Sequence, residues 1–203
     1  MKRRSDGKVR RTYISRVAAL QPNGTFNEDK PQLGLVEDIG TGDLVLKFKD
    51  AAELATMRRA AQISAGAHCR AMRTTCPGRF EYEIEAELLH AFRAAGSQAP
   101  AYTSIVAGGA NACVLHYVEN DQPLRDGDLL LIDAGCELDG YASDITRTFP
   151  VNGRFSGPQR EVYELVLSAQ AAAREATRPG AHWNQPHDAA VKVLAQGMID
   201  LGL

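Results

Sequence analysis

The sequence has no run of about 18 apolar residues, so it offers no candidate for a transmembrane helix. We also expect no secretory signal, because the first residues are basic and contain no apolar core segment. Its four cysteines form no C-x-x-C pair, which favours reduced thiols and a cytoplasmic protein. With a formal charge of -2, the composition points neither to nucleic acid nor to an anionic membrane as a partner.

What the sequence does contain is ordinary for a soluble globular protein, with 44% apolar and 24% charged residues in a chain of 203. We expect a basic, weakly structured segment over residues 1–49 and one folded domain over residues 50–203. The basic start is either an organelle-targeting or nucleic-acid arm, or a solvated tail. Its cationic residues are Lys2, Arg3, Arg4, Lys8, Arg10, Arg11 and Arg16. A short strand is expected over residues 43–48.

Helical spacing of apolar residues predicts helices over residues 50–75, 81–95, 156–178 and 186–201. The first opens with a capping box formed by Asp50 and Glu53. Its expected apolar stripe consists of Leu54, Met57, Ala61, Ala65, His68 and Met72. Short strands are expected over residues 104–107 and 112–117. The order of elements predicts an α+β fold, an antiparallel sheet with helices covering one face.

The segment around which the chain is organised reads as a β-hairpin. The apolar run Leu129–Ile132 is expected to be a central, buried strand that ends in Asp133. Asp139 and Gly140 form an Asp-Gly turn signal, and the second strand carries Asp144.

Two carboxylates on paired strands require compensation for their desolvation. In one interpretation, both oxygen-donor side chains bind a divalent cation such as Mn²⁺, Mg²⁺ or Zn²⁺. In the other, Asp133 caps a turn and Asp144 forms an ion pair with Arg147. The residues of the hairpin alone leave both interpretations open.

Residues 132–135 (IDAG) and 140–153 (GYASDITRTFPVNG) resemble the metal-binding hairpin of aminopeptidase P. This is the Xaa-Pro aminopeptidase branch of the pita-bread metallopeptidases, family M24, and the resemblance extends from about Asp50 to the C-terminus. It implies a partial pita-bread fold and a dinuclear metal site, expected to hold two Mn²⁺ ions. By resemblance, Asp133 and Asp144 are metal ligands. The resemblance also implies that His116, in a Leu-His-Tyr sequence, is a catalytic residue that handles protons or stabilises the transition state.

The resemblance also implies a set of five protein ligands, of which this chain carries two. The remaining His and two Glu belong to later segments of the family fold, and neither His182 nor His187 has the sequence context of the family histidine. We therefore expect an incomplete catalytic domain that is weakly active or inactive alone. A complementary C-terminal half or a homo-oligomer would be the partner.

The reaction implied by the resemblance is the release of an N-terminal residue from a peptide with Pro at its second position. Two alternatives stay open at this stage. One is a non-catalytic, pita-bread-like binding module, and the other is a prolidase-type dipeptidase of the same fold.

Overall fold

The structure, a computed structural model, describes residues 11–20, 26–38, 44–47 and 49–203. The chain divides into two compact units. One is formed by the described residues from Asp50 to Ser156. The other contains the described strands before Asp50 and the residues from Gly157 onward. No helix among the described residues is long and apolar enough to cross a membrane.

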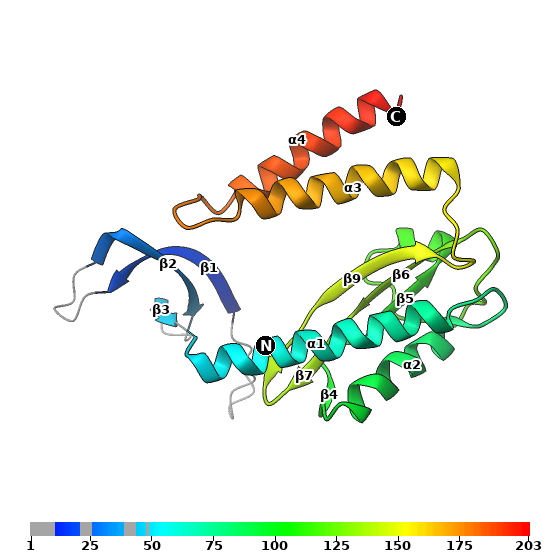
Figure 1. The fold of residues 1–203 in the computed structure, drawn as a ribbon, viewed down its shortest axis with the longest axis horizontal. Coiled ribbons are helices and arrows are strands. Elements are labelled where there is room, and N and C mark those ends of the chain that lie inside the picture. Colours follow the sequence, from blue (N-terminus) through cyan, green and yellow to red (C-terminus); the bar gives the residue numbers. More distant parts are fainter. Residues whose placement is uncertain (1–10, 21–25, 39–43, 48) are drawn as a thin grey trace. The chain divides into compact units, whose positions relative to one another are not determined.

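The first unit is built on an antiparallel sheet of three strands, β5 (Ile105–Gly108), β6 (Leu129–Ala134) and β9 (Ile145–Pro150), in the order β5-β6-β9 (Figure 1). The predicted central position of the apolar run is confirmed. Side chains of β6 alternate between buried and half-buried, so the strand has one fully covered face and one partly open face.

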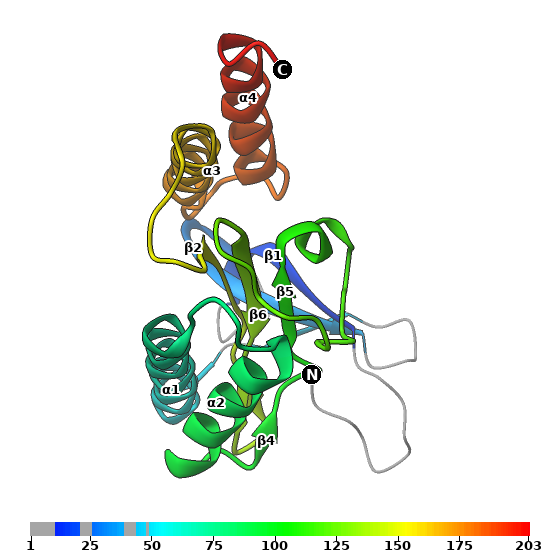
Figure 2. The same cartoon turned by 90° about the vertical axis from the view of Figure 1, so that its right-hand side faces the viewer.

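Two helices, α1 (Ala51–Thr74) and α2 (Glu81–Ala94), cover the buried face of this sheet (Figures 1 and 2). The predicted capping box is present, since Asp50 and Glu53 each accept a hydrogen bond from the other's backbone N–H. The core joins both helices to the sheet. Its largest fully buried side chains include Phe92, Ile84, Leu88, Leu130 and Ile132.

The buried face of α1 differs from the predicted stripe. Of the predicted residues, His68 is buried, whereas Ala61 and Ala65 are exposed and Leu54 and Met72 are each 38% exposed. The observed buried face consists of Ala60, Ile63, Ser64, Ala67, His68 and Ala71. These side chains are mostly small, which lets the helix backbone approach the strands closely.

A second, smaller sheet of the first unit has the strand order β4-β7-β8. Its strands are β4 (Ala99–Pro100), β7 (Cys136–Leu138) and β8 (Tyr141–Ala142). Asp139 and Gly140 connect β7 to β8 with φ values of 50° and 83°. Two successive left-handed residues are typical of a tight hairpin turn, so the predicted Asp-Gly turn is confirmed.

One predicted strand is wrong. Residues 112–117 do not form a strand, because Gly109–Cys113 is a short 3₁₀ helix (η1) that leads into a turn. The turn is closed by a hydrogen bond of 3.3 Å from the Tyr117 amide to the Val114 carbonyl. His116 therefore lies in a turn, with φ of 56°, and not in a strand.

The second unit contains a sheet of three antiparallel strands, in the order β1-β2-β3. They are β1 (Arg11–Leu20), β2 (Phe26–Asp38) and β3 (Leu44–Lys47). The strand predicted over residues 43–48 corresponds to β3, and its end residues lie outside the described part. The predicted basic cluster falls largely on residues 1–10, which also lie outside it.

The same unit contains the helices α3 (Gly157–Ala176) and α4 (Gln185–Asp200), which pack against each other. Both match the predicted helical segments closely. The expected division into a segment over residues 1–49 and a domain over residues 50–203 stays a prediction.

Candidate metal centre

The register of β6 sets the direction of Asp133. Every second residue of this strand lies on the fully buried face beneath the helices, namely Leu130, Ile132 and Ala134. Asp133 therefore projects from the opposite face, where it is half-buried and pairs in register with Thr146 of β9. A carboxylate in this position is partly removed from water.

Asp144 reaches the same place from a break in the second strand. It lies between β8 and β9 and its residue is exposed. The crossing of the two chain segments is very close at Gly135. A Cβ atom on Gly135 would lie 1.8 Å from the Ser143 carbonyl oxygen and 3.1 Å from the Asp144 amide nitrogen. Only glycine fits this crossing, which brings the residues after Asp133 against the backbone of Asp144.

A buried polar cluster holds the crossing from the side of α1. The hydroxyl groups of Ser64 and Ser143 lie 2.7 Å apart. The Cys136 amide donates to both hydroxyl oxygens, at 3.0 and 3.1 Å. Because buried polar groups that all have partners specify one arrangement, this cluster fixes the position of the strand that leads to Asp144.

Tyr102 joins the two carboxylates. Its hydroxyl lies 2.6 Å from Oδ1 of Asp133 and 3.1 Å from Oδ1 of Asp144. Burial, followed by the hydrogen bond to Asp133, raises the pKa of this phenol far above its usual range, so it remains a donor. The segment is held in place by the Ala101 amide, which donates to the Gly135 carbonyl at 2.8 Å. Sequence reasoning did not identify Tyr102, since nothing local marks it.

The carboxylates have no cationic partner among the described residues. The alternative ion pair between Asp144 and Arg147 is not formed there, and the Arg147 guanidinium instead donates to the Thr146 carbonyl at 2.7 Å. Two carboxylate oxygens within hydrogen-bonding distance of a single hydroxyl converge on one point. Oxygen donors arranged in this way suit a hard or borderline divalent ion. The residues present thus fit such an ion, and their role as ligands stays a prediction.

The rest of the expected ligand set is not found here. Among the described residues, no group of three or more His, Cys, Asp or Glu side chains could hold a metal ion. His182 and His187 are both exposed and belong to the other unit. His116 is exposed as well, and within the described part no hydrogen bond joins it to Asp133 or Asp144.

His68 lies behind the candidate centre, on the covered side of the sheet. It is 2% exposed, and its Nε2 lies 3.0 Å from the carbonyl oxygen of Ala134. Its Nδ1 is buried and has no hydrogen-bond partner within the described part of the chain. Burial lowers the pKa of this imidazole, although the hydrogen bond to Ala134 opposes the shift. His68, which lies on the predicted stripe of the first helix, is thus a packed helix residue.

The lowered pKa of His68 predicts acid sensitivity. The unfolded chain binds a proton here near pH 6.5, whereas the folded chain resists it, so stability falls as pH drops below about 6.5. The slope from this residue reaches at most about 1.4 kcal/mol per pH unit. His68→Gln should remove that part of the slope, as measured by urea unfolding between pH 7 and 5. His90→Gln, at an exposed histidine of α2, is the control, and an equal slope change in both variants would contradict the assignment.

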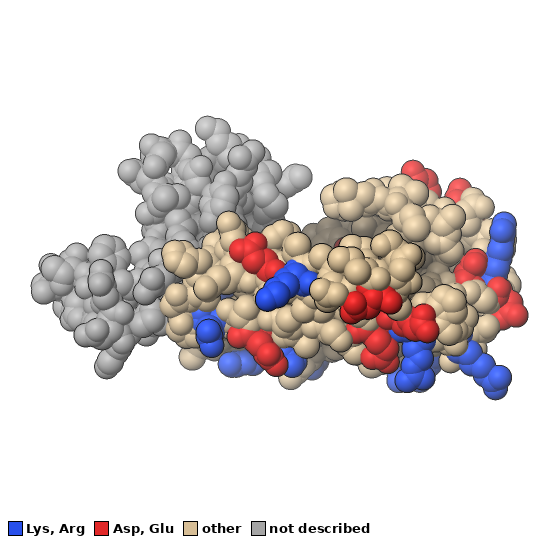
Figure 3. Space-filling model, turned by 90° about the horizontal axis from the view of Figure 1, so that it is seen from above, with Lys and Arg blue, Asp and Glu red and all other residues tan. Residues whose placement is uncertain are grey.

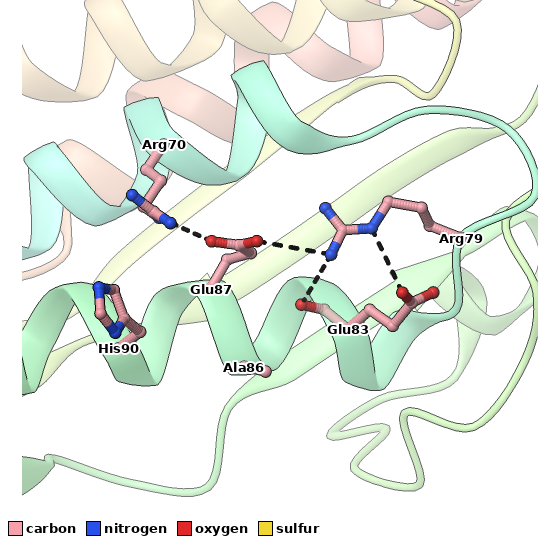
Figure 4. Close-up of a pocket in the computed structure, with 6 residues that line it drawn as sticks. All are labelled: Arg70, Arg79, Glu83, Ala86, Glu87 and His90. Atoms are coloured by element: carbon pink, nitrogen blue, oxygen red, sulfur yellow. Dashed lines mark hydrogen bonds and ion pairs between the residues drawn. The ribbon is translucent and has the colours of Figure 1, made fainter.

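A surface cavity of about 420 Å³ between α1 and α2 is a separate feature (Figure 4). In it, Glu87 lies between Arg70, at 2.7 Å, and Arg79, at 3.5 Å, and Arg79 also approaches Glu83. The hydrogen bond from Arg70 lowers the pKa of Glu87. The Arg and Glu side chains that line this cavity form ion pairs with one another, so the cavity is not the candidate centre. On the face drawn in Figure 3, acidic and basic side chains are likewise interspersed.

The part of the chain that contains Asp133 and Asp144 is similar to known proteins. The sequence model described as metallopeptidase family M24 matches residues 55–202. The Xaa-Pro aminopeptidase of Haemophilus influenzae is 57% identical over 156 residues, which are 77% of this chain and 36% of that protein. The chain therefore spans about a third of the length of this relative.

Solved structures of aminopeptidase P match the same part of the chain. The aminopeptidase PepP of Pseudomonas aeruginosa matches with a TM-score of 0.76 and 59% identity, over 76% of this chain and 35% of that one. A zinc-substituted aminopeptidase P of Escherichia coli, in complex with product, matches with a TM-score of 0.75 and 48% identity, over 76% and 35% of the two chains. The α+β architecture predicted above is therefore that of part of the aminopeptidase P catalytic fold.

Proposed function

Because the chain belongs to metallopeptidase family M24, we propose that it supplies part of the catalytic centre of a metal-dependent Xaa-Pro aminopeptidase. The reaction would release the N-terminal residue from a peptide with Pro at its second position. The observation that carries the proposal is the convergence of Asp133 and Asp144 on the Tyr102 hydroxyl. The four cysteines, all free thiols, support a cytoplasmic location.

The roles follow from the chemistry of the side chains. Asp133 and Asp144 would hold the divalent metal, which we propose to be a pair of Mn²⁺ ions. When bound, such ions lower the pKa of a coordinated water and polarise the scissile carbonyl. Tyr102 orients both carboxylates through its hydroxyl. His116, exposed and outside the ligand set, would transfer a proton or donate a hydrogen bond to the developing oxyanion.

The described residues provide two carboxylates and no third candidate ligand beside them. Two such ligands leave most coordination positions of a divalent ion to water or to other donors, so binding should be weak. We therefore expect the chain alone to release little or no amino acid from Xaa-Pro peptides. Activity should require the further donors that the resemblance implies.

A chimera tests the proposal. Residues 55–202 of this chain would replace the matching segment of the Escherichia coli Xaa-Pro aminopeptidase, which is 48% identical over 156 residues. The purified chimera would be assayed with Xaa-Pro tripeptides, Xaa-Pro dipeptides and Xaa-Ala tripeptides, with Mn²⁺ and after chelation. We expect Mn²⁺-dependent release from the Xaa-Pro tripeptides and none from the Xaa-Ala series.

Other outcomes have defined meanings. Turnover of dipeptides alone would replace the proposal by a prolidase-type activity. A folded chimera that binds Mn²⁺ but cleaves no Xaa-Pro peptide would contradict it and favour a non-catalytic binding module.

A further inference from the structure

A fully buried carboxylate, that of Glu81, lies in the first unit. Glu81 is the first residue of α2 and is completely buried. Its Oε1 accepts hydrogen bonds from the Gly108 amide, at 2.8 Å, and from the Asn111 side chain, at 3.0 Å. Its Oε2 accepts from the Tyr117 hydroxyl, at 2.7 Å, and from the Gln122 amide, at 3.0 Å.

All four donors belong to one stretch of chain, which leaves β5 at Gly108 and returns to α2 at Gln122. The backbone closes the same loop, because the Glu81 amide donates to the Gln122 carbonyl at 3.0 Å. His116 lies in the middle of this loop, next to Tyr117. A single carboxylate thus holds the start, the middle and the end of the loop that carries His116.

The charge of Glu81 has no cationic counterpart among the described residues. Four donors and the positive end of the α2 dipole take the place of a cation. Tyr117 fits this arrangement, since burial and then the hydrogen bond to Glu81 raise its pKa to about 12. A buried carboxylate that is costly to desolvate, and whose donors all come from one loop, is better suited to fixing that loop than to stabilising the core in general.

The conformation of the loop needs such support. His116 has φ of 56°, a left-handed conformation that costs a non-glycine residue energy. It is exposed, and Leu115 beside it is 87% exposed, so contacts of their own side chains do not fix them. The neighbouring Tyr117, 7% exposed, points inward to Glu81. The anchor of His116 is therefore the residue that follows it.

We propose that Glu81 is a positioning residue, which holds His116 in its left-handed turn. The inference rests on the proposed role of His116, since positioning matters only if that imidazole acts on substrate. Asn120, buried and with φ of 49°, supports the same loop by accepting from the Val106 amide at 2.9 Å. The Asn120 side chain also donates to the Ser104 carbonyl at 2.9 Å and to Glu85 of α2 at 3.1 Å, whereas Glu81 accepts hydrogen bonds from residues on both sides of His116.

Glu81→Gln in the full chain is the first test. Each carboxylate oxygen accepts two hydrogen bonds, and a glutamine has a single oxygen, so two donors would face an NH₂ group. We expect amide hydrogen exchange at Gly108 and Gln122 to be about ten- to a hundred-fold faster. The NMR resonances of the His116 amide and ring should shift and broaden. Glu175→Gln, at an exposed glutamate of α3, is the charge-matched control and should change neither.

Two further measurements separate positioning from a general structural role. Exchange in β6 and the weak Mn²⁺ affinity of the chain should stay as in the wild type, because Asp133 and Asp144 lie on other segments. Tyr117→Phe removes one donor, and it should shift the same His116 resonances to a smaller extent. This second variant keeps the test available if Glu81→Gln does not fold.

Unchanged His116 resonances in either folded variant would overturn the proposal. So would faster exchange throughout β6 together with loss of Mn²⁺ binding, since Glu81 would then support the whole domain. In an active chimera, Glu81→Gln should lower kcat about ten-fold or more with KM little changed. The NMR result does not depend on turnover, so an inactive chimera would contradict the proposed function and leave the positioning of His116 to be decided by NMR.

Discussion

Gly135→Ala is expected to destabilise the first unit strongly and to separate the two carboxylates of the candidate centre. The added Cβ would lie 1.8 Å from the Ser143 carbonyl oxygen and 2.5 Å from its carbon. These are backbone atoms that cannot rotate away, so one of the two chain segments must move. Overpacking in a well-packed core costs about 1–3 kcal/mol, and a backbone overlap belongs at or above the upper end.

The expected result is a fall in melting temperature of about 10 °C or more, with loss of the hydrogen bonds around Ser143. Gly66→Ala is the matched control. Gly66 lies in the exposed part of α1 with nothing within 4 Å of its added Cβ. Alanine should leave stability unchanged there or raise it by up to about 1 kcal/mol. Equal melting temperatures of the two variants would show that the crossing is not as close as described.

The second large effect is expected from the carboxylates themselves. Asp133→Asn and Asp144→Asn each remove one of the two negative charges that converge on the Tyr102 hydroxyl. Mutation of groups that merely orient metal ligands costs about 10–100-fold in affinity or activity, so loss of a ligand should exceed about 100-fold. In the chimera, each variant should reduce kcat/KM for Xaa-Pro tripeptides by at least that factor, and the Mn²⁺ concentration for half-maximal activity should rise.

Asp139→Asn provides the control within the same hairpin. It makes the same change of charge, and asparagine tolerates the left-handed conformation at that turn, with φ of 50°. It should retain turnover within about two-fold of the unmodified chimera, because nothing places it among the ligands. If all three variants lost activity equally, general electrostatics or folding of the hairpin would explain the result, and the assignment of Asp133 and Asp144 would fail.

The sequence was most informative where the structure depends on neighbours in the chain. The Asp-Gly turn, the capping box at Asp50 and the central position of β6 follow from local rules, and all three are present. The proximity of Asp133 to Asp144 also follows from pairing across one hairpin. The reason for their close approach could not be predicted from the sequence. The need for glycine at position 135 appears only when Ser143 is packed against it.

Side chains that act across the fold could not be predicted in this way. Tyr102 is separated from Asp133 by 31 residues, and Glu81 from Tyr117 by 36. Glu81 resembled an ordinary acidic residue in the first turn of a helix, where its neighbours are exposed or half-buried. Only the tertiary fold turns it inward. The strand predicted over residues 112–117 is wrong, because a 3₁₀ helix and a turn replace it and leave the apolar Val114 and Leu115 exposed.

The most direct test of the central claim is to locate bound Mn²⁺ on the chain by paramagnetic broadening of amide NMR signals. Trace Mn²⁺ should first broaden the amides of Asp133, Asp144 and Tyr102, even if binding is weak, and Asp133→Asn with Asp144→Asn should abolish this. Broadening centred on the acidic side chains of α2, such as Glu83 and Glu87, and unchanged in the double variant, would contradict the claim that the hairpin carboxylates form a metal site.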